Sequence, residues 1–542
     1  MSNIKNTGLV IFLISLTLFT GTIFMGSFHL SPSALDDFIS EKGYQNALIK
    51  AELTKAIVTD KPLNIFEFSK RVRNAYAVSN THYDLLIQRY EAEKNWAKKG
   101  EQYQYKIFGK PHTLSFDLAK KAGKGYLKDH VGLMWILTFG LGILGSLLII
   151  LSDSIIQGKA GIKNDHIYFK ASTNRGWIAW LVLIYLVSFY LLLYFLPDYV
   201  VNWTFIVDPI SLFLNGGLAS QWFMYGFLYC TIMLIMALRM YIKYRDNKYQ
   251  LIRTTSVLFF QIVFAFLIPE IMNSLNMPGY DFKNAFPLDY DFFFDWNLDH
   301  LRNSGSIGLF ILIWGIVLTL IIVPVMVYFF GKRWYCSWVC GCGGLAETLG
   351  DPYRQHSDKS LNAWKIERWL IHMVLVFSLV MTLVTLYCYF TKSSSLLGIN
   401  SQWIKDSYSF LIGSWFSGVI GTGFYPIFGN RVWCRFGCPL AAYMGIIQRF
   451  KSRFRITTNG GQCISCGNCS TYCEQGIDVR AYAQKGENIV RSSCVGCGIC
   501  TAVCPRGVLK LENGLEKGRI NPKDILLGNN IDLIQLVNKR EK

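Results

Sequence analysis

The feature that most constrains this chain is a series of eight apolar segments, each about 20 residues long. A helix of that length spans the roughly 30 Å hydrocarbon core of a bilayer. Charged residues make up only 17% of the 542 residues, below the roughly 25% that is usual in soluble domains. We therefore expect a polytopic α-helical membrane protein with about eight spans, near 8–28, 131–151, 176–196, 222–242, 254–274, 306–330, 369–391 and 409–428.

The loops between these segments alternate in charge. Lysine and arginine cluster in every second loop, for example after the sixth and eighth segments, whereas residues 197–221 contain neither. Because cytoplasmic loops are enriched in Lys and Arg, this pattern predicts that both termini are cytoplasmic. The same loops account for the net charge of +18. No groove-reading motif accompanies that charge, so we expect membrane lipid as the surrounding partner and no nucleic acid.

The apolar segments also suggest domain boundaries. The first apolar run is longer than a signal-peptide core and no small-x-small cleavage site follows it, so we expect an uncleaved N-terminal anchor. The segment after that anchor would then be extracytoplasmic and mostly helical. The expected divisions are the anchor (1–28), the external segment (29–130), spans two to four (131–253), two hairpin repeats (254–455), a ferredoxin domain (456–515) and a cytoplasmic tail (516–542).

One motif occurs twice, 98 residues apart. The stretches GKRWYCSWVCGC (331–342) and GNRVWCRFGCPL (429–440) share the frame Gly-x-Arg-x-(Tyr/Trp)-Cys-x-(Trp/Phe)-x-Cys. Each copy ends a pair of apolar segments, so each unit is a membrane hairpin that brings two cysteines to the cytoplasmic edge. Repeats in membrane proteins often share a site at their interface. The candidate residues for that site are Cys336, Cys340, Cys434 and Cys438.

The spacing within each motif restricts what these cysteines can do. Residues four apart on one helix lie on the same face with Cβ atoms ~5–6 Å apart, whereas a disulfide requires ~3.5–4.5 Å. We therefore expect a membrane-edge redox or metal site that holds a third cluster, a copper ion or a thiol relay. Burial as small apolar side chains is the plain alternative. Cys342 has Leu440 as its counterpart, and is a weaker candidate, either a substitute ligand or a bystander.

The C-terminal region contains two four-cysteine runs with the spacing C-x2-C-x2-C-x3-C. In two-cluster ferredoxins the fourth cysteine of each run ligates the other [4Fe–4S] cluster. This rule assigns Cys463, Cys466, Cys469 and Cys504 to cluster A, and Cys494, Cys497, Cys500 and Cys473 to cluster B. Zinc is the alternative metal, but it rarely uses two complete runs of this kind.

Two further features of these runs bear on the cluster environment. Glycines between the cysteines (Gly467, Gly496 and Gly498) allow backbone amides to approach the sulfurs. Glu474 follows Cys473 where the bacterial run has proline, and a carboxylate beside a cluster is expected to lower its potential.

With both motif sets in view, the chain resembles the polyferredoxin-type membrane proteins NapH, NosR and CcoG over about residues 254–515. The family pattern C-x3-C-P is kept at Cys438–Pro439, but Gly341 follows Cys340. The external segment lacks a flavin-attachment motif of the NosR kind, so the resemblance implies a divergent subgroup. It also implies a bacterial inner (plasma) membrane protein that acts as an electron-transfer component of an oxidoreductase, similar to a quinol dehydrogenase. No catalytic residue is indicated.

Three functions fit these observations. The first is electron transfer between quinol or a cytoplasmic donor and a respiratory or extracytoplasmic acceptor via two [4Fe–4S] clusters, with the quinone pool and a redox partner protein as partners. The second is a copper-handling oxidase assembly factor that reduces Cu(II), similar to CcoG. Its support is a stripe of soft ligands, Cys230, Met233, Met236 and Met240, which would suit Cu(I) or simply fill a core. The third is a redox-sensing regulator.

Overall fold

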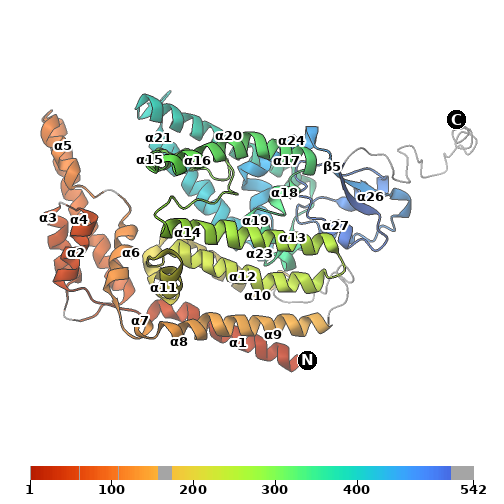
Figure 1. Ribbon diagram of the computed structural model, residues 1–542, viewed down its shortest axis with the longest axis horizontal. Helices are drawn as coiled ribbons and strands as arrows, with labels where there is room; N and C mark the ends of the chain where they lie inside the picture. The colour runs from red at the N-terminus through yellow and green to blue at the C-terminus, as the bar shows by residue number, and fades with distance from the viewer. Residues whose placement is uncertain (1, 45, 60, 108, 157–173, 514–542) are drawn as a thin grey trace, which may run out of the picture. The chain divides into compact units, whose positions relative to one another are not determined.

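The computed structural model describes residues 2–44, 46–59, 61–107, 109–156 and 174–513 (Figure 1). The expected tail 516–542 and the basic residues Lys159, Lys163 and Lys170 lie outside these ranges. The chain is mostly helical and divides into two compact units. The first comprises Met1–Gln157, Tyr185–Ile235 and Phe266–Gly279, and the second comprises Gly158–Ile184, Met236–Ala265 and Tyr280–Lys542.

The first unit contains a close pair of apolar helices, α1 (Ser2–Gly21) and α9 (Leu141–Ile156). A Cβ added at Gly8 would lie 2.8 Å from Leu148 Cβ, and one added at Gly145 would lie 2.7 Å from the amide nitrogen of Phe12. Small residues of this kind allow helix backbones to approach closely in membranes. The unit also contains α7 (Tyr126–Asp129), α8 (Val131–Trp135), α11 (Val201–Asn215) and α14 (Ile268–Ser274), and shares α10 (Trp177–Phe195) and α12 (Gln221–Lys243) with the second unit.

Residues 29–130 form a separate set of helices within the first unit. They begin at polar caps: the side chains of Ser31, Asn46 and Asn64 each accept a hydrogen bond from an amide three residues on, as favoured N-cap residues do. A short antiparallel pairing of β1 (Ser27–Phe28) with β2 (Gly123–Lys124) joins the two ends of the set. Its helices are α2 (Pro32–Lys42), α3 (Ala47–Ile57), α4 (Ile65–Ala92), α5 (Trp96–Tyr105) and α6 (Pro111–Ala122).

Seven helices in the described ranges are long and apolar enough to cross a membrane. They are Asn3–Phe24, Val131–Ser152, Trp177–Phe195, Gln221–Lys243, Lys248–Ser274, Gly305–Phe330 and Leu361–Thr391. The multi-pass prediction is confirmed to this extent. The eighth expected span, 409–428, is not among them. It consists of a π-helical segment (Ser409–Ile420), α22 (Gly421–Gly423) and α23 (Tyr425–Phe428), and its glycines and serines reduce both its hydropathy and its helix propensity.

The second unit holds the repeated motifs at the ends of apolar helices. Gly331 and Gly429 follow α17 and α23 with φ angles of 67° and 90°, a backbone region that glycine adopts readily. The helices of this unit include α13 (Lys248–Phe259), α15 (Asp295–Asn303), α16 (Gly305–Val317), α17 (Val323–Phe330), α18 (Arg333–Cys336), α19 (Gly341–Glu347), α20 (Leu361–Thr391), α21 (Ser401–Tyr408) and α24 (Pro439–Lys451). A hairpin of β3 (Ser395–Leu396) and β4 (Ile399–Asn400) follows α20.

The C-terminal module of the second unit has the expected α+β composition. Strands β5 (Phe454–Thr458) and β6 (Leu509–Asn513) pair antiparallel and close the module. Helices α25 (Asn468–Thr471) and α27 (Ile499–Ala502) each follow a glycine in the left-handed conformation, Gly467 at φ 80° and Gly498 at φ 75°. The longer α26 (Val479–Lys485) lies between them in the chain. The two four-cysteine runs therefore fold alike.

Candidate iron–sulfur and membrane-edge cysteine sites

Two cavities lie in the C-terminal module, and each is lined by four cysteines. The first is lined by residues of both four-cysteine runs. Its cysteines are the set predicted for cluster A: Cys463, Cys466, Cys469 and Cys504. Cys466 is exposed and Cys469 is buried, so this cavity, termed cavity A, is open to the surface on one side.

The second cavity, cavity B, is also lined by residues of both runs. Its cysteines are the set predicted for cluster B: Cys473, Cys494, Cys497 and Cys500. None of these four is exposed. In both cavities the fourth cysteine comes from the other run, and the helices α25 and α27 of the two runs pack against each other.

The spread of the thiols distinguishes these cavities from sites for a single metal ion. A zinc ion holds its four ligands at about 2.0–2.3 Å. Within the described ranges, no three histidine, cysteine or acidic side chains are gathered around one point in that way. The four thiols of each set instead lie at separate places on the wall of one cavity. That arrangement fits a cofactor in which each thiolate binds a different iron at the edge of a cluster.

The loop that lines cavity B is fixed to the ends of the apolar helices by hydrogen bonds to its carbonyls. Gln448 Nε2 donates to the carbonyls of Arg491 and Cys494, both at 2.7 Å. Ser337 Oγ donates to Val495 (2.9 Å). Three residues of α13 complete the set: Tyr249 donates to Gly496 (2.8 Å), and Gln250 and Arg253 both donate to Cys497 (2.9 and 2.7 Å).

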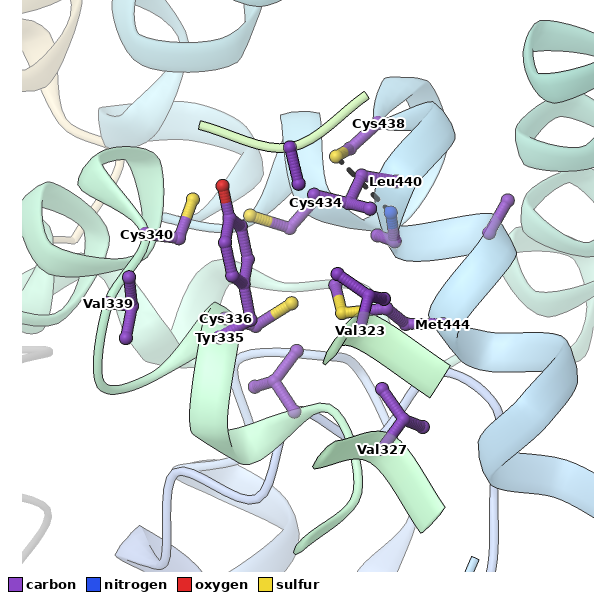
Figure 2. Close-up of a cluster of buried hydrophobic side chains, with 14 of the residues drawn as sticks. Val323, Val327, Tyr335, Cys336, Val339, Cys340, Cys434, Cys438, Leu440 and Met444 are labelled. Carbon is purple, nitrogen blue, oxygen red and sulfur yellow. Dashed lines mark hydrogen bonds between the residues drawn. The ribbon is translucent and has the colours of Figure 1, made fainter. Parts of the chain in front are cut away.

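The four cysteines of the repeated motifs come together in one buried cluster. Cys336, Cys340, Cys434 and Cys438 are all buried in the same group of side chains, which Cys497 of cavity B also contacts. Figure 2 shows their four sulfurs in one region between the two motifs. The repeat therefore produces a shared site, here termed the four-cysteine site, and its packing extends to cavity B.

The local backbone at this site differs from the continuous helix expected from the spacing. Helix α18 ends at Cys336, and Cys340 is the N-cap of α19. In the second copy, Cys434 lies in a π-helical turn and Cys438 is the N-cap of α24, where its sulfur accepts a hydrogen bond from the amide of Ala441 at 3.4 Å (Figure 2). A helix N-terminus favours a thiolate, but at Cys438 burial outweighs this effect and raises the pKa of the thiol well above its usual value. The proline of C-x3-C-P takes the first helical position, which suits its fixed φ.

Two residues of this site were underestimated by sequence reasoning. The thiol of Cys342 hydrogen-bonds Cys340 and lowers the pKa of Cys340 to about 6, so Cys342 takes part in the site. Tyr335 is 2% exposed, its ring lies among the thiols in Figure 2, and its hydroxyl donates to the carbonyl of Lys283 at 3.0 Å. The (Tyr/Trp) position of the repeated frame, occupied by Tyr335 and Trp433, was the signal that could have identified it.

A buried network of charges connects the four-cysteine site to cavity B. Arg431 lies at its centre with a side chain that is 0% exposed. Its guanidinium donates to the carbonyl of Cys336 (3.2 Å) and to Cys434 Sγ (3.6 Å), and pairs with Glu347 and with Glu474 (3.0 Å). Because Glu474 follows Cys473 directly, a single arginine contacts both the membrane-edge motif and the chain that lines cavity B.

The surroundings of Glu474 change the expected effect of its charge. Burial alone would raise the pKa of Glu474, but Arg354 and Arg431 lower that pKa to about 2, and Arg354 pairs with it at 2.6 Å. Arg253 pairs with Glu347 in the same network. Arg354 also pairs with Asp351, which Arg239 and Lys243 contact as well, so five cationic side chains face three carboxylates in this network. These positive charges oppose the lowering of the cluster potential that the sequence indicates for Glu474, and that lowering stays a prediction.

The soft-ligand stripe of α12 consists of core side chains, and its last member packs beside cavity B. Cys230 and Met233 are buried in the described structure. Met240 is 1% exposed and packs against Tyr472, Ile499 and Val503 of the C-terminal module. This is the ordinary use of methionine as a core side chain.

Comparison with known proteins agrees with this geometry. Residues 462–509 match a family described as a 4Fe-4S dicluster domain. Residues 311–360 and 411–457, which contain the two repeated motifs, each match a family described as a 4Fe-4S binding domain. The prediction of a ferredoxin-type 4Fe-4S protein with several apolar helices is thereby confirmed.

Two relatives show the same resemblance. The chain is 26% identical over 156 residues to YccM, a candidate electron transport protein of Escherichia coli (strain K12). The aligned stretch covers 27% of this chain and 43% of YccM. It is 29% identical over 158 residues to the methylamine utilization ferredoxin-type protein MauN of Methylobacillus flagellatus. This aligned stretch covers 29% of this chain and 53% of MauN. The chain thus spans about half the length of these relatives. No solved structure matches it.

Proposed function

We propose that this chain is a membrane-bound iron–sulfur protein that passes electrons between quinol or a cytoplasmic donor and a respiratory or extracytoplasmic acceptor. The observation that supports this most strongly is the pair of cavities, each lined by four cysteines drawn from both runs. The names of YccM and MauN refer to electron transport and to a ferredoxin-type protein. The further parallel to NapH, NosR and CcoG proteins belongs to this proposal.

The ligand sets follow from the cavities. Cys463, Cys466, Cys469 and Cys504 would hold cluster A, and Cys473, Cys494, Cys497 and Cys500 would hold cluster B. A [4Fe–4S] cluster takes up or gives up one electron at a potential that its charge surroundings and hydrogen bonds determine. The chain contributes the thiolates, the amides near the sulfurs, and the excess of arginines beside Cys473.

The four-cysteine site would be the next redox station, on the membrane side of cavity B. A hydrocarbon core of roughly 30 Å is too thick to cross without an intermediate carrier. The 4Fe-4S binding domain matches contain both motifs, which favours a third cluster over copper or a thiol relay there. Packing of Cys497 against the same buried side chains as Cys336 and Cys438 gives a continuous protein path from cavity B. A quinone would exchange electrons on this side.

The proposal includes a placement in the inner membrane of a bacterium, with both termini in the cytoplasm. The support for it is the alternation of basic loops. The eight cysteines then lie in a reducing compartment, where thiols remain available for clusters.

An EPR-monitored redox titration of protein purified anaerobically in detergent tests the proposal. We expect at least two [4Fe–4S] signals, of which Cys463→Ala/Cys466→Ala removes that of cluster A and Cys494→Ala/Cys497→Ala removes that of cluster B. Added menadiol, a quinol, or a low-potential donor should change the oxidation state of the clusters. Protein with intact clusters that exchanges electrons with neither class of reagent would contradict electron transfer and favour a redox-sensing role.

A further inference from the structure

We infer that the surface around cavity A is the docking site for a small soluble one-electron carrier whose cofactor is surrounded by carboxylates. This inference rests on the proposed function and adds to it the entry face and the chemistry of the partner. It begins from the difference between the cavities: Cys466 of cavity A is exposed, whereas no cysteine of cavity B is.

The rim of cavity A combines an apolar contact with positive charge. Ile464 is 55% exposed beside Cys466. Arg480 and Arg506 both line the cavity, both are exposed, and neither forms an ion pair with another described residue. An exposed apolar side chain at the cofactor with unpaired charges around it is typical of a transient docking surface, because charge steers the encounter and a small contact allows rapid release.

The charge of the rim selects the kind of partner. Two further exposed lysines, Lys485 at the end of α26 and Lys510 on β6, increase the positive charge of the same module. The complementary partner therefore carries an acidic surface. An anionic lipid headgroup would also complement the charge, but it would not require an exposed cysteine ligand. In Figure 1, α26 lies at the end of the second unit opposite α15 and α21.

The transfer itself involves one electron and no other group. The electron leaves the reduced carrier and enters the cofactor held by Cys466 and its three partners, and no bond forms or breaks in the chain. Cavity B, with its loop held against α13 and Gln448, then lies between this entry face and the four-cysteine site. The order of stations would be carrier, cavity A, cavity B and four-cysteine site.

Binding of an acidic flavodoxin to the full chain in nanodiscs of neutral lipid tests the docking surface. The readout is the fluorescence anisotropy of the oxidised flavin, which requires no electron transfer. We expect that Arg480→Glu/Arg506→Glu weakens the affinity about tenfold at low ionic strength, and that salt weakens the wild-type affinity more than that of the variant. The control Lys55→Glu/Lys70→Glu makes the same change in net charge on exposed residues of the first unit and should leave the affinity unchanged.

Two results would overturn the inference. One is equal affinity of the wild type and the Arg480/Arg506 variant for flavodoxin. Equal affinity of the wild type for native flavodoxin and for flavodoxin with amidated carboxylates would count in the same way. The other is binding that disappears in nanodiscs of anionic lipid, which would assign the rim to lipid contact. Dithionite separates these results from failure of the proposed function. Dithionite should reduce the clusters of the wild type and of both variants to the same extent. Reduced flavodoxin should reduce the clusters of the Arg480/Arg506 variant more slowly than those of the wild type and of the control variant.

Discussion

Replacement of Arg431 by methionine should separate the C-terminal module from the membrane-edge motifs. The change keeps much of the stem of the side chain and removes its charge. It deletes two charge-assisted hydrogen bonds, to Glu347 and Glu474, each of which contributes about 1.5–3 kcal/mol. Each glutamate keeps one arginine, Arg253 or Arg354, so neither carboxylate is left alone. Only the bond to Glu474 joins the C-terminal module to the membrane-edge motifs, because Glu347 belongs to α19, so we expect a loss of about 1.5–3 kcal/mol in the free energy of docking.

Amide hydrogen exchange measures this loss where it should appear. A loss of about 1.5–3 kcal/mol corresponds to about 10- to 150-fold faster exchange, and we expect it at the amides of 491–500, a segment that includes residues lining cavity B. Arg431→Lys keeps the charge with fewer donors and should give an intermediate rate. Arg73→Met removes an arginine whose Nε lies 2.9 Å from Asp198 in the first unit, and serves as the matched control.

The reasoning would be refuted by unchanged protection of 491–500 in the Arg431→Met protein. It would also be refuted if Arg73→Met accelerated exchange in this segment to the same degree, since the effect would then report general destabilisation and not the loss of a specific bridge.

Three further predictions follow from single positions. Gln448→Leu should lower the melting temperature by several degrees in a thermal scan, because it leaves the carbonyls of Arg491 and Cys494 unsatisfied at about 1–3 kcal/mol each; an unchanged melting temperature would contradict this. Gly498→Ala places a Cβ 2.7 Å from side chains of Leu511 and Tyr249 at φ 75°, so iron analysis should show loss of iron from cavity B alone, and full iron content would count against it. Lys243, Arg239 and Arg354 hold the pKa of buried Asp351 well below 3.8, so its contribution to stability is complete above that pH and is lost as pH falls through the lower, folded-state pKa. The difference in melting temperature between wild type and Asp351→Asn should thus stay constant from about pH 8 to 5 and shrink only in stronger acid. If this difference already declined near neutral pH, the lowered pKa of Asp351 would be contradicted.

The C-terminal module could be predicted from sequence because its chemistry is local. Cysteines three and four residues apart, with glycine among the residues between them, already define which side chains can surround one cofactor. The crossing of Cys473 and Cys504 to the opposite cavities follows from the twofold repeat of the runs. The structure places all eight cysteines around the two cavities in the expected groups.

The membrane-edge site was predictable only in part. The repeated frame indicated that Cys336, Cys340, Cys434 and Cys438 would meet, and they share one buried cluster. The assumption of a continuous helix was wrong, because a helix ends or is distorted at the first cysteine of each pair and another begins at the second. Helix propensity alone does not show such breaks, since tertiary contacts determine them.

The buried charge network could not be read from the chain. Arg253, Glu347, Arg431 and Glu474 are separated by tens of residues, and nothing in their local sequence indicates that they meet. The basic residues were attributed to the positive-inside pattern, and their pairing in the fold is an additional role. The segment 409–428 was expected to span the membrane because it is an apolar stretch of about 20 residues. Sequence alone did not indicate that the structure divides it into a π-helical segment and two short helices.

The measurement that tests the central claim most directly is the iron and acid-labile sulfide content per chain of anaerobically purified protein. Cavities A and B together predict at least about eight irons and eight sulfides. They also predict a loss of about four irons in Cys463→Ala/Cys466→Ala with the remainder retained. Zinc in place of iron and sulfide, or an iron content that these two substitutions leave unchanged, would contradict the assignment of the two cavities as [4Fe–4S] sites.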